Sequence, residues 1–267
     1  MSLFVCHKTY IAAGLGLVVV LLLIFANPHK GPCNVAYIPL HGYMTTYIPE
    51  SEVATSSNAS DQTASEEVTQ AIRQAAANPN MKAVVLEIDS PGGLPVAGQE
   101  IEEALKQVQK PTVALIREQG DSAAYMSATG ANTIFASDFS DVGDIGITES
   151  YTDNSKQDES NGVTFNQLSI GKYKDMFNTD KPMTPDEQAL AMQELQANYQ
   201  DFVQIVADNR HMSVDAVTAL ADGSSVTGEE ALKDGLIDKI GNIDDVRNYL
   251  TEKIKRNAII CGVDADR

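Results

Sequence analysis

The chain has 267 residues, 43% of them hydrophobic, which is enough for one large domain or two small ones around a substantial core. Its formal net charge of -18 argues against nucleic acid as a partner, because a phosphate backbone attracts basic surfaces. The four His residues have no metal-ligand spacing and no CxxC pair occurs. We therefore expect no structural zinc site and no cofactor.

An apolar segment runs without interruption from residue 10 to residue 26. Roughly 17 residues is short for a membrane-spanning helix, but no clear cleavage site follows and the segment has no polar face. We expect an uncleaved transmembrane signal anchor at 10–26, between a tail at 1–9 and a linker at 27–33. The flanking Lys8 and Lys30 nearly cancel. A single pass through the cell membrane with the catalytic part on the extracytoplasmic side is therefore only the favoured orientation.

Strands and helices alternate along the next hundred residues, which predicts βαβ units and a largely parallel sheet. In such sheets, functional residues gather at the carboxyl ends of the strands, where both Gly92-Gly93 and Ser122 fall. One helix is expected after a capping box at Thr63–Glu66. Another is expected after Gly93, with Val96 on its buried side. Strands are expected at 34–40, 81–88, 112–116 and 133–136, with a polar loop at 43–61 and a short polar bend before Ser122.

The second half of the chain has a different pattern. Turn residues dominate 138–162, and the polar run 150–161 reads as an exposed loop. Thr184-Pro-Asp-Glu187 predicts the start of a long helix that reaches about Asn209, and shorter helices are expected after Ser213 and at Gly228–Lys233. Between the loop and the long helix, Lys172 and Lys174 form a small basic cluster in an acidic chain.

Ser122 is placed to act as an acyl-transfer nucleophile at the start of a helix, although a serine there is most often a simple helix cap. A serine nucleophile needs a base, and none of the four His residues has a suitable context. Lys172 or Lys174 is the remaining choice, provided that burial keeps the amine neutral. For the oxyanion, the turn at Gly92 and Gly93 offers backbone N–H groups, with the N–H of Ala123 as a second donor.

Four ordered segments carry a family resemblance. Residues 86–93 (LEIDSPGG), 122–125 (SAAY), 170–175 (IGKYKD) and 222–238 resemble successive motifs of the signal peptide peptidase A family. The resemblance covers about residues 34–246. We accordingly expect a catalytic domain at 34–250 followed by a C-terminal tail at 251–267.

The resemblance implies a serine endopeptidase with a Ser/Lys dyad on an α/β fold of the Clp-protease and crotonase type, a repeated ββα spiral with a parallel sheet. Ser122 matches the nucleophile and Lys174 the general base, with Lys172 the less favoured reading. Gly93 matches the oxyanion glycine, with Gly92 beside it. The implied substrates are apolar peptides, such as signal peptide remnants or membrane-protein segments. Relatives form rings in which neighbouring chains complete each site, so a homo-oligomer is expected.

Departures from the family pattern leave alternatives open. Ser-Ala-Ala-Tyr stands where the family has Ser-Gly-Gly-Tyr, and Ser224 stands where an Arg is frequent. Asp121 places a carboxylate beside the nucleophile, where it would favour a protonated Lys174. The alternatives are a stomatin-cleaving membrane protease of the Clp class, a catalytically impaired peptide-binding scaffold, and a crotonase-like acyl-CoA enzyme. Cys33 and Cys261 either pair or remain free thiols.

Overall fold

The computed structural model describes residues 33–49 and 62–263. The predicted tail at 1–9, the predicted signal anchor at 10–26 and all of the 27–33 linker except Cys33 lie outside these residues. Within the two described ranges, no helix is both long enough and apolar enough to cross a membrane.

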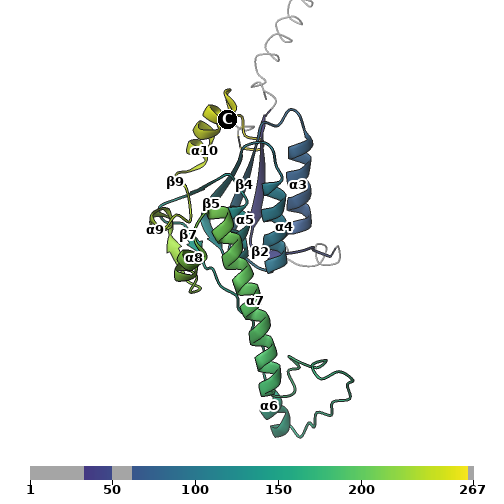
Figure 1. Cartoon of the computed structure of the whole chain (residues 1–267). Coiled ribbons are helices and arrows are strands. Elements are labelled where there is room, and N and C mark those ends of the chain that lie inside the picture. The colour runs from purple at the N-terminus through teal and green to yellow at the C-terminus, as the bar shows by residue number, and fades with distance from the viewer. Residues whose placement is uncertain (1–32, 50–61, 264–267) are drawn as a thin grey trace, which may run out of the picture.

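A mostly parallel sheet forms the centre of the molecule, as the alternating pattern predicted (Figure 1). The main path runs β1 (Val35–His41), β4 (Ala83–Ser90), β5 (Thr112–Asp121), β6 (Thr133–Ala136) and β9 (Lys239–Ile240). Beyond this path, β7 (Asp141–Gly143) pairs in parallel with the end of β5 and antiparallel with β8 (Ser225–Thr227). A separate parallel pair joins β2 (Tyr43–Thr45) and β3 (Gln62–Ala64).

Helices cover both faces of the sheet, which explains why β4 is apolar along most of its length. Leu86 and Ile88 point into the larger core, while Val85 points into a smaller core beneath α10 (Ile243–Ile254). The larger core is covered by α3 (Ser65–Ala77), α4 (Pro95–Lys106), α5 (Ala123–Thr129) and the C-terminal half of α7 (Pro185–Arg210). Two short helices, α8 (Val214–Leu220) and α9 (Gly228–Lys233), follow α7.

Three local expectations were wrong. Thr63 belongs to β3 and its hydroxyl donates to the carbonyl of His41 at 2.6 Å, so α3 begins after Ala64 with no side-chain cap. The polar residues before Ser122 form no bend, because β5 continues to Asp121 by pairing with β7. Val96 does not line the buried side of α4, since 54% of its surface is exposed.

A projection that we call the arm (residues 149–197) extends beyond this body (Figure 1). It contains α6 (Ser155–Ser160) within the predicted exposed loop, and the outer part of α7. The predicted capping box at the start of α7 is confirmed, since Thr184 and Glu187 bond each other's backbone N–H groups. Lys181 donates to Glu187 at 2.8 Å, and this bond together with those from Thr184 lowers the pKa of Glu187 to about 2.

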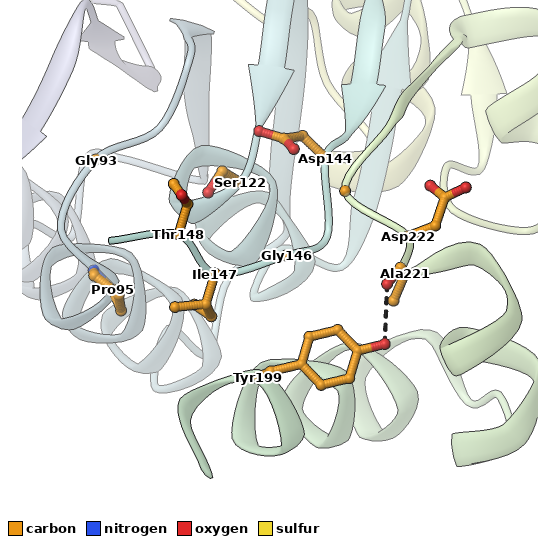
Figure 2. Close-up of a pocket in the computed structure, with 11 residues that line it drawn as sticks. Gly93, Pro95, Ser122, Asp144, Gly146, Ile147, Thr148, Tyr199, Ala221 and Asp222 are labelled. Carbon is orange, nitrogen blue, oxygen red and sulfur yellow. Dashed lines mark hydrogen bonds between the residues drawn. The ribbon is translucent and has the colours of Figure 1, made fainter. Parts of the chain in front are cut away.

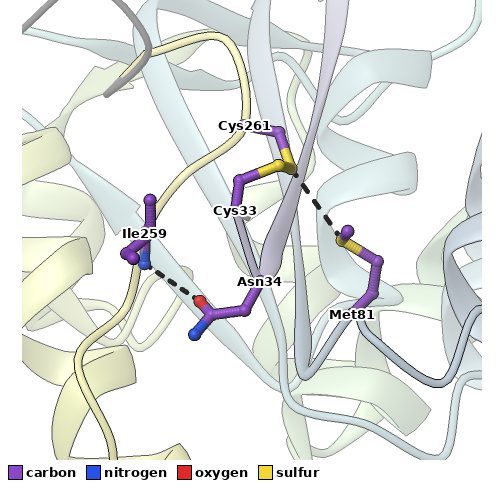
Figure 3. The surroundings of a disulfide bond; sticks show 5 residues. All are labelled: Cys33, Asn34, Met81, Ile259 and Cys261. Carbon is purple, nitrogen blue, oxygen red and sulfur yellow. Dashed lines mark hydrogen bonds between the residues drawn. A yellow bond between two sulfur atoms is a disulfide. The ribbon is translucent and has the colours of Figure 1, made fainter. Parts of the chain in front are cut away.

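A disulfide joins Cys33 to Cys261 and resolves the open question about these thiols (Figure 3). Beside it, the Ile259 N–H donates to Asn34 Oδ1 at 2.9 Å, and the Cys261 N–H donates to the carbonyl of Val35 at 2.9 Å. The predicted C-terminal tail at 251–267 begins inside α10, and Ile260 is fully buried in the smaller core. The described part of that tail therefore packs on the domain.

Candidate active site

Ser122 lies at a sharp turn between β5 and α5, at the start of the helix as predicted. Its φ of 54° and ψ of -123° are rare for a residue with a side chain. The conformation is held by a hydrogen bond from the Ser122 N–H to the carbonyl of Gly143 at 2.8 Å. As a result, the hydroxyl is carried on a rigid turn at the carboxyl end of the sheet.

The Gly92-Gly93 turn packs directly against this turn. A Cβ on Gly92 would lie 2.8 Å from the Ser122 Cβ, and one on Gly93 would lie 2.2 Å from the carbonyl oxygen of Met44. The Gly92 N–H already donates to Ser90 Oγ at 3.0 Å. The N–H groups of Gly93 and Ala123 have no acceptor among the described residues. These two groups, rather than that of Gly92, are free to bind an oxyanion, as an oxyanion hole requires.

A cavity of about 500 Å³ opens beside Ser122 (Figure 2). Pro95 and Ile147 give it an apolar wall, which the ring of Tyr199 extends; the Tyr199 hydroxyl donates to the carbonyl of Ala221 at 2.9 Å. The remaining lining comes from Gly93, Asp144, Gly146, Thr148, Ala221, Asp222 and Gly223. A cavity with an apolar wall next to a nucleophile and two free N–H groups is suited to holding a peptide.

Two carboxylates lie near the nucleophile, and the sequence singled out only one of them. Asp121 is 7% exposed, and its Oδ1 accepts a hydrogen bond from Ser225 at 2.8 Å. Burial raises the pKa of Asp121, and the residue does not line the cavity. Asp144 does line it, with a φ of 46° and a pKa that burial raises. Asp144 could not be singled out from the sequence, because Gly143-Asp-Ile-Gly146 has the pattern of an ordinary turn.

Neither lysine of the basic cluster lines the cavity. Lys174 is exposed on the arm, and Lys172 is paired with Asp186, whose oxygen lies 2.5 Å from its Nζ. The Ser122 hydroxyl has no hydrogen-bond partner in the described part of the chain. One copy therefore brings together the nucleophile and the free N–H groups of Gly93 and Ala123, and it leaves Lys174 apart from them.

Comparisons with known proteins found a family and several relatives. Residues 104–257 match the model of peptidase family S49. A candidate protease of Synechocystis sp. is 33% identical over 69% of this chain and 65% of its own length. A candidate signal peptide peptidase of Enterococcus faecium is 31% identical over 66% of this chain and 52% of its own. The chain thus spans about half to two thirds of these relatives.

A solved structure is similar in fold. A ClpP1 mutant from Listeria monocytogenes superposes with a TM-score of 0.51 over 78% of this chain and 92% of its own, at 13% identity. At that identity the likeness concerns the fold alone, and it confirms the expected α/β architecture of the Clp-protease and crotonase type with a parallel sheet.

Proposed function

This chain belongs to peptidase family S49, a family of Ser/Lys dyad hydrolases, and on that premise we propose that it is a serine endopeptidase with Ser122 as its nucleophile. The observation that carries the proposal is the meeting of the two turns at the carboxyl ends of β4 and β5. There Ser122 and Gly93 border one cavity, and Ala123, whose N–H is also free, follows Ser122 directly in the chain. Acyl transfer needs this combination of nucleophile and oxyanion donors.

We propose Lys174 of a neighbouring copy as the general base. Ser122 has no base partner within the described part of its own chain, and Lys174 is exposed on an arm that extends away from the body (Figure 1). A homo-oligomeric ring would bring the arm of one copy to the cavity of the next. Burial of a lysine between two chains removes water from its ammonium group and favours the neutral form that a base requires.

In the proposed reaction, Ser122 Oγ attacks the substrate carbonyl carbon while its proton passes to the neutral Lys174 Nζ. The N–H groups of Gly93 and Ala123 stabilise the negative charge that develops on the carbonyl oxygen. Collapse of this intermediate breaks the C–N bond, and the proton on Lys174 goes to the departing amine. A water molecule deprotonated by Lys174 then hydrolyses the acyl-enzyme and restores Ser122.

For the substrate, we propose apolar peptides such as signal peptide remnants, or segments of membrane proteins, at the cell membrane. The apolar wall of Pro95, Ile147 and Tyr199 supports this class of substrate. The signal anchor proposed at 10–26 would hold the chain at the membrane, and the disulfide supports an oxidising, extracytoplasmic side for the catalytic domain. A stomatin-cleaving membrane protease uses the same chemistry and remains the second candidate.

Cleavage of a fluorogenic apolar peptide by the full chain in detergent tests the proposal. We expect Ser122→Ala and Lys174→Ala each to lower kcat by a factor of about 10³ or more, because each removes a reacting group. Lys172→Ala is the matched control, and we expect it to retain most of the activity.

Mixing the two inactive variants tests the neighbouring-copy arrangement. If the base comes from a second chain, oligomers that contain both variants recover part of the activity, because some sites combine an intact Ser122 with an intact Lys174. Undiminished cleavage by Ser122→Ala would refute the assignment of the nucleophile. Absence of cleavage by every form, including the unmodified chain, would favour a peptide-binding scaffold.

A further inference from the structure

A buried hydroxyl adjoins the Gly92-Gly93 turn and has no part in the proposed reaction. It belongs to Ser90, the fully buried last residue of β4. Its Oγ donates to the carbonyl of Gly42 at 2.6 Å and accepts the N–H of Gly92 at 3.0 Å. A hydroxyl that is shielded from solvent and bound on both sides cannot meet a substrate. Any role of Ser90 is therefore exerted through the two backbone groups that it binds.

The sequence explains why a side chain is needed at this point. Gly42 runs beside the end of β4, and its N–H donates to the carbonyl of Asp89 at 3.0 Å. In a parallel ladder, the carbonyl of Gly42 would next accept the N–H of residue 91. Residue 91 is a proline, which has no N–H. The Ser90 hydroxyl supplies the missing donor and carries the ladder past the proline.

Each of the two peptide groups of the turn is fixed by one hydrogen bond. The group between Pro91 and Gly92 is held through its N–H by the Ser90 hydroxyl. The group between Gly92 and Gly93 is held through its C=O, which accepts the N–H of Met44 at 2.9 Å. The C=O and N–H of a trans peptide point in opposite directions, so the free N–H of Gly93 points away from Met44. Gly93 lines the cavity (Figure 2).

Two glycines in succession make this orientation easy to lose. Gly92 and Gly93 have φ angles of +97° and +157°, and residues without a side chain let the adjoining peptide groups rotate at little cost. Rotation of the group between them would turn a carbonyl oxygen toward the place of the oxyanion and remove the N–H from it. Two negative atoms would then meet where the reaction needs a donor. The bond to Ser90 opposes this rotation, because it fixes the preceding peptide group.

From these contacts we propose that Ser90 is a positioning residue of the oxyanion hole. Its hydroxyl bridges the gap that Pro91 leaves in the ladder and holds the N–H of Gly92. The N–H of Gly93 is thereby kept in place as the donor to the substrate oxygen. The inference rests on the proposed function, since the oxyanion hole belongs to that reaction. It does not depend on a second copy, because every contact lies within one chain.

Cleavage kinetics of the full chain in detergent give the first test. Ser90→Ala removes the hydroxyl, and we expect kcat to fall by a factor of about 10 to 100. This is less than the factor of about 10²–10³ that follows the outright loss of an oxyanion donor. KM should change by less than about twofold, because Ser90 does not line the cavity. Ser90→Thr keeps a hydroxyl at this position and should recover part of the lost kcat.

A peptide aldehyde separates binding of the oxyanion from general damage to the site. Ser122 Oγ adds to the aldehyde carbon, the serine proton passes to the base, and the former carbonyl oxygen takes the negative charge. The matching peptide alcohol binds without forming this bond. We expect Ser90→Ala to lower the affinity for the aldehyde by about the same factor as kcat, and to leave the affinity for the alcohol within about twofold.

Thr112→Val is the matched control. Thr112 is buried at the opposite end of β5 from Ser122, and its hydroxyl accepts the N–H of Asn132 at 2.8 Å. Either substitution leaves a backbone N–H without its acceptor, so the free energy of unfolding should fall in both variants. The ratio of aldehyde to alcohol affinity should fall only in Ser90→Ala. The proposal is overturned if Ser90→Ala keeps the ratio of the unmodified chain, or if Thr112→Val lowers it equally.

Amide hydrogen exchange gives a readout that requires no catalysis. Exchange in residues 89–94, measured by mass spectrometry, should be faster in Ser90→Ala than in the unmodified chain, because the N–H of Gly92 loses its acceptor. Thr112→Val should leave exchange in this segment unchanged. Equal exchange in Ser90→Ala and the unmodified chain would show that the turn is held without Ser90.

The two proposals fail in distinguishable ways. If the unmodified chain neither cleaves peptides nor prefers the aldehyde to the alcohol, the proposed function is wrong and the oxyanion hole with it. If the unmodified chain does both and Ser90→Ala does both equally well, only the positioning role of Ser90 is wrong.

Discussion

At the carboxyl ends of β4 and β5, backbone atoms lie in contact with one another, whereas most side chains of the arm face water. A single Cβ has no room at Gly92 or Gly93. In the arm, Leu168 and Ile170 are each 99% exposed, and a Cβ at Gly162 would meet nothing within 4 Å. Both regions carry residues of the proposed dyad, Ser122 in the first and Lys174 in the second.

The contrast indicates how the two halves of the proposed site are positioned. The nucleophile and the oxyanion donors are fixed by the body's own packing, which leaves few alternative conformations. Lys174 is on a segment whose apolar side chains are largely without cover in one copy. Isolated exposed apolar residues are common, but a projecting group of them is typical of an interaction surface. Three experiments test this contrast.

Removal of a core side chain should have the largest effect. Ile88 is fully buried in β4, and Ile88→Ala should lower the free energy of unfolding by about 4 kcal/mol, through lost burial and a cavity. Leu168→Ala on the arm should change it by less than about 0.5 kcal/mol, because that side chain is exposed. Urea denaturation monitored by circular dichroism measures both. A large loss in Leu168→Ala would mean that the arm is part of the stabilising core.

An added methyl group compares the backbones of the two regions. Gly93→Ala places a Cβ 2.2 Å from the backbone oxygen of Met44, and no side-chain movement can relieve this clash. We expect a loss of about 3 kcal/mol in unfolding free energy, and a loss of activity as the turn shifts. Gly162→Ala meets no neighbouring atom, so its cost is the backbone strain of a φ of +73°, about 1 kcal/mol in unfolding free energy. Equal losses in the two variants would contradict the difference in packing.

Acid titration compares a buried carboxylate of the body with one of the arm, and its effect is the smallest. Burial favours a raised pKa for Glu87, but hydrogen bonds from His41, Tyr37 and Arg117 outweigh it and lower the pKa. A lowered pKa gives stability that is present above the ordinary carboxyl pKa and lost as pH falls through the folded value. Glu87→Gln should therefore weaken the pH dependence of unfolding, by about 1 kcal/mol between about pH 6 and about pH 3.

The control for this titration is Glu118, an exposed carboxylate of the body, and the arm carboxylate for comparison is Glu187. Glu118→Gln, at an exposed position of β5, should leave the pH profile unchanged. Glu187, whose pKa is lowered to about 2, should affect the resistance of the arm to limited proteolysis at low pH more than global unfolding. If Glu187→Gln changed global unfolding as much as Glu87→Gln, the arm and the body would unfold as one unit.

The body could be predicted from sequence because its signals are local. Hydrophobic runs marked the strands, and Thr184 with Glu187 marked the start of α7 through a bond between residues three apart. The capping box at Thr63 failed because a distant partner competes for the same hydroxyl: His41, on another strand, accepts its hydrogen bond. Local patterns predict local bonds only where no such partner intervenes.

The site was predictable in its nucleophile and less so in its surroundings. Ser122 and Gly93 stood out as turns that follow apolar strands. The sequence predicted that the Asp121 carboxylate would favour a protonated Lys174. In the structure, this carboxylate accepts a hydrogen bond from the hydroxyl of Ser225, which lies 104 positions along the chain. Asp144 entered the cavity through the pairing of β7 with β5, which no short pattern encodes. Registers between distant strands decide which carboxylate lines the cavity.

The disulfide between Cys33 and Cys261, which are 228 positions apart, closes the chain between them into a covalent ring. One cut of the backbone inside that ring, for example in the exposed arm, opens the loop without dividing the molecule. The two pieces stay joined through sulfur, and β1 keeps its place beside the segment that ends at Cys261. A chain with a protruding arm can thus be nicked once in that arm and still remain a single molecule.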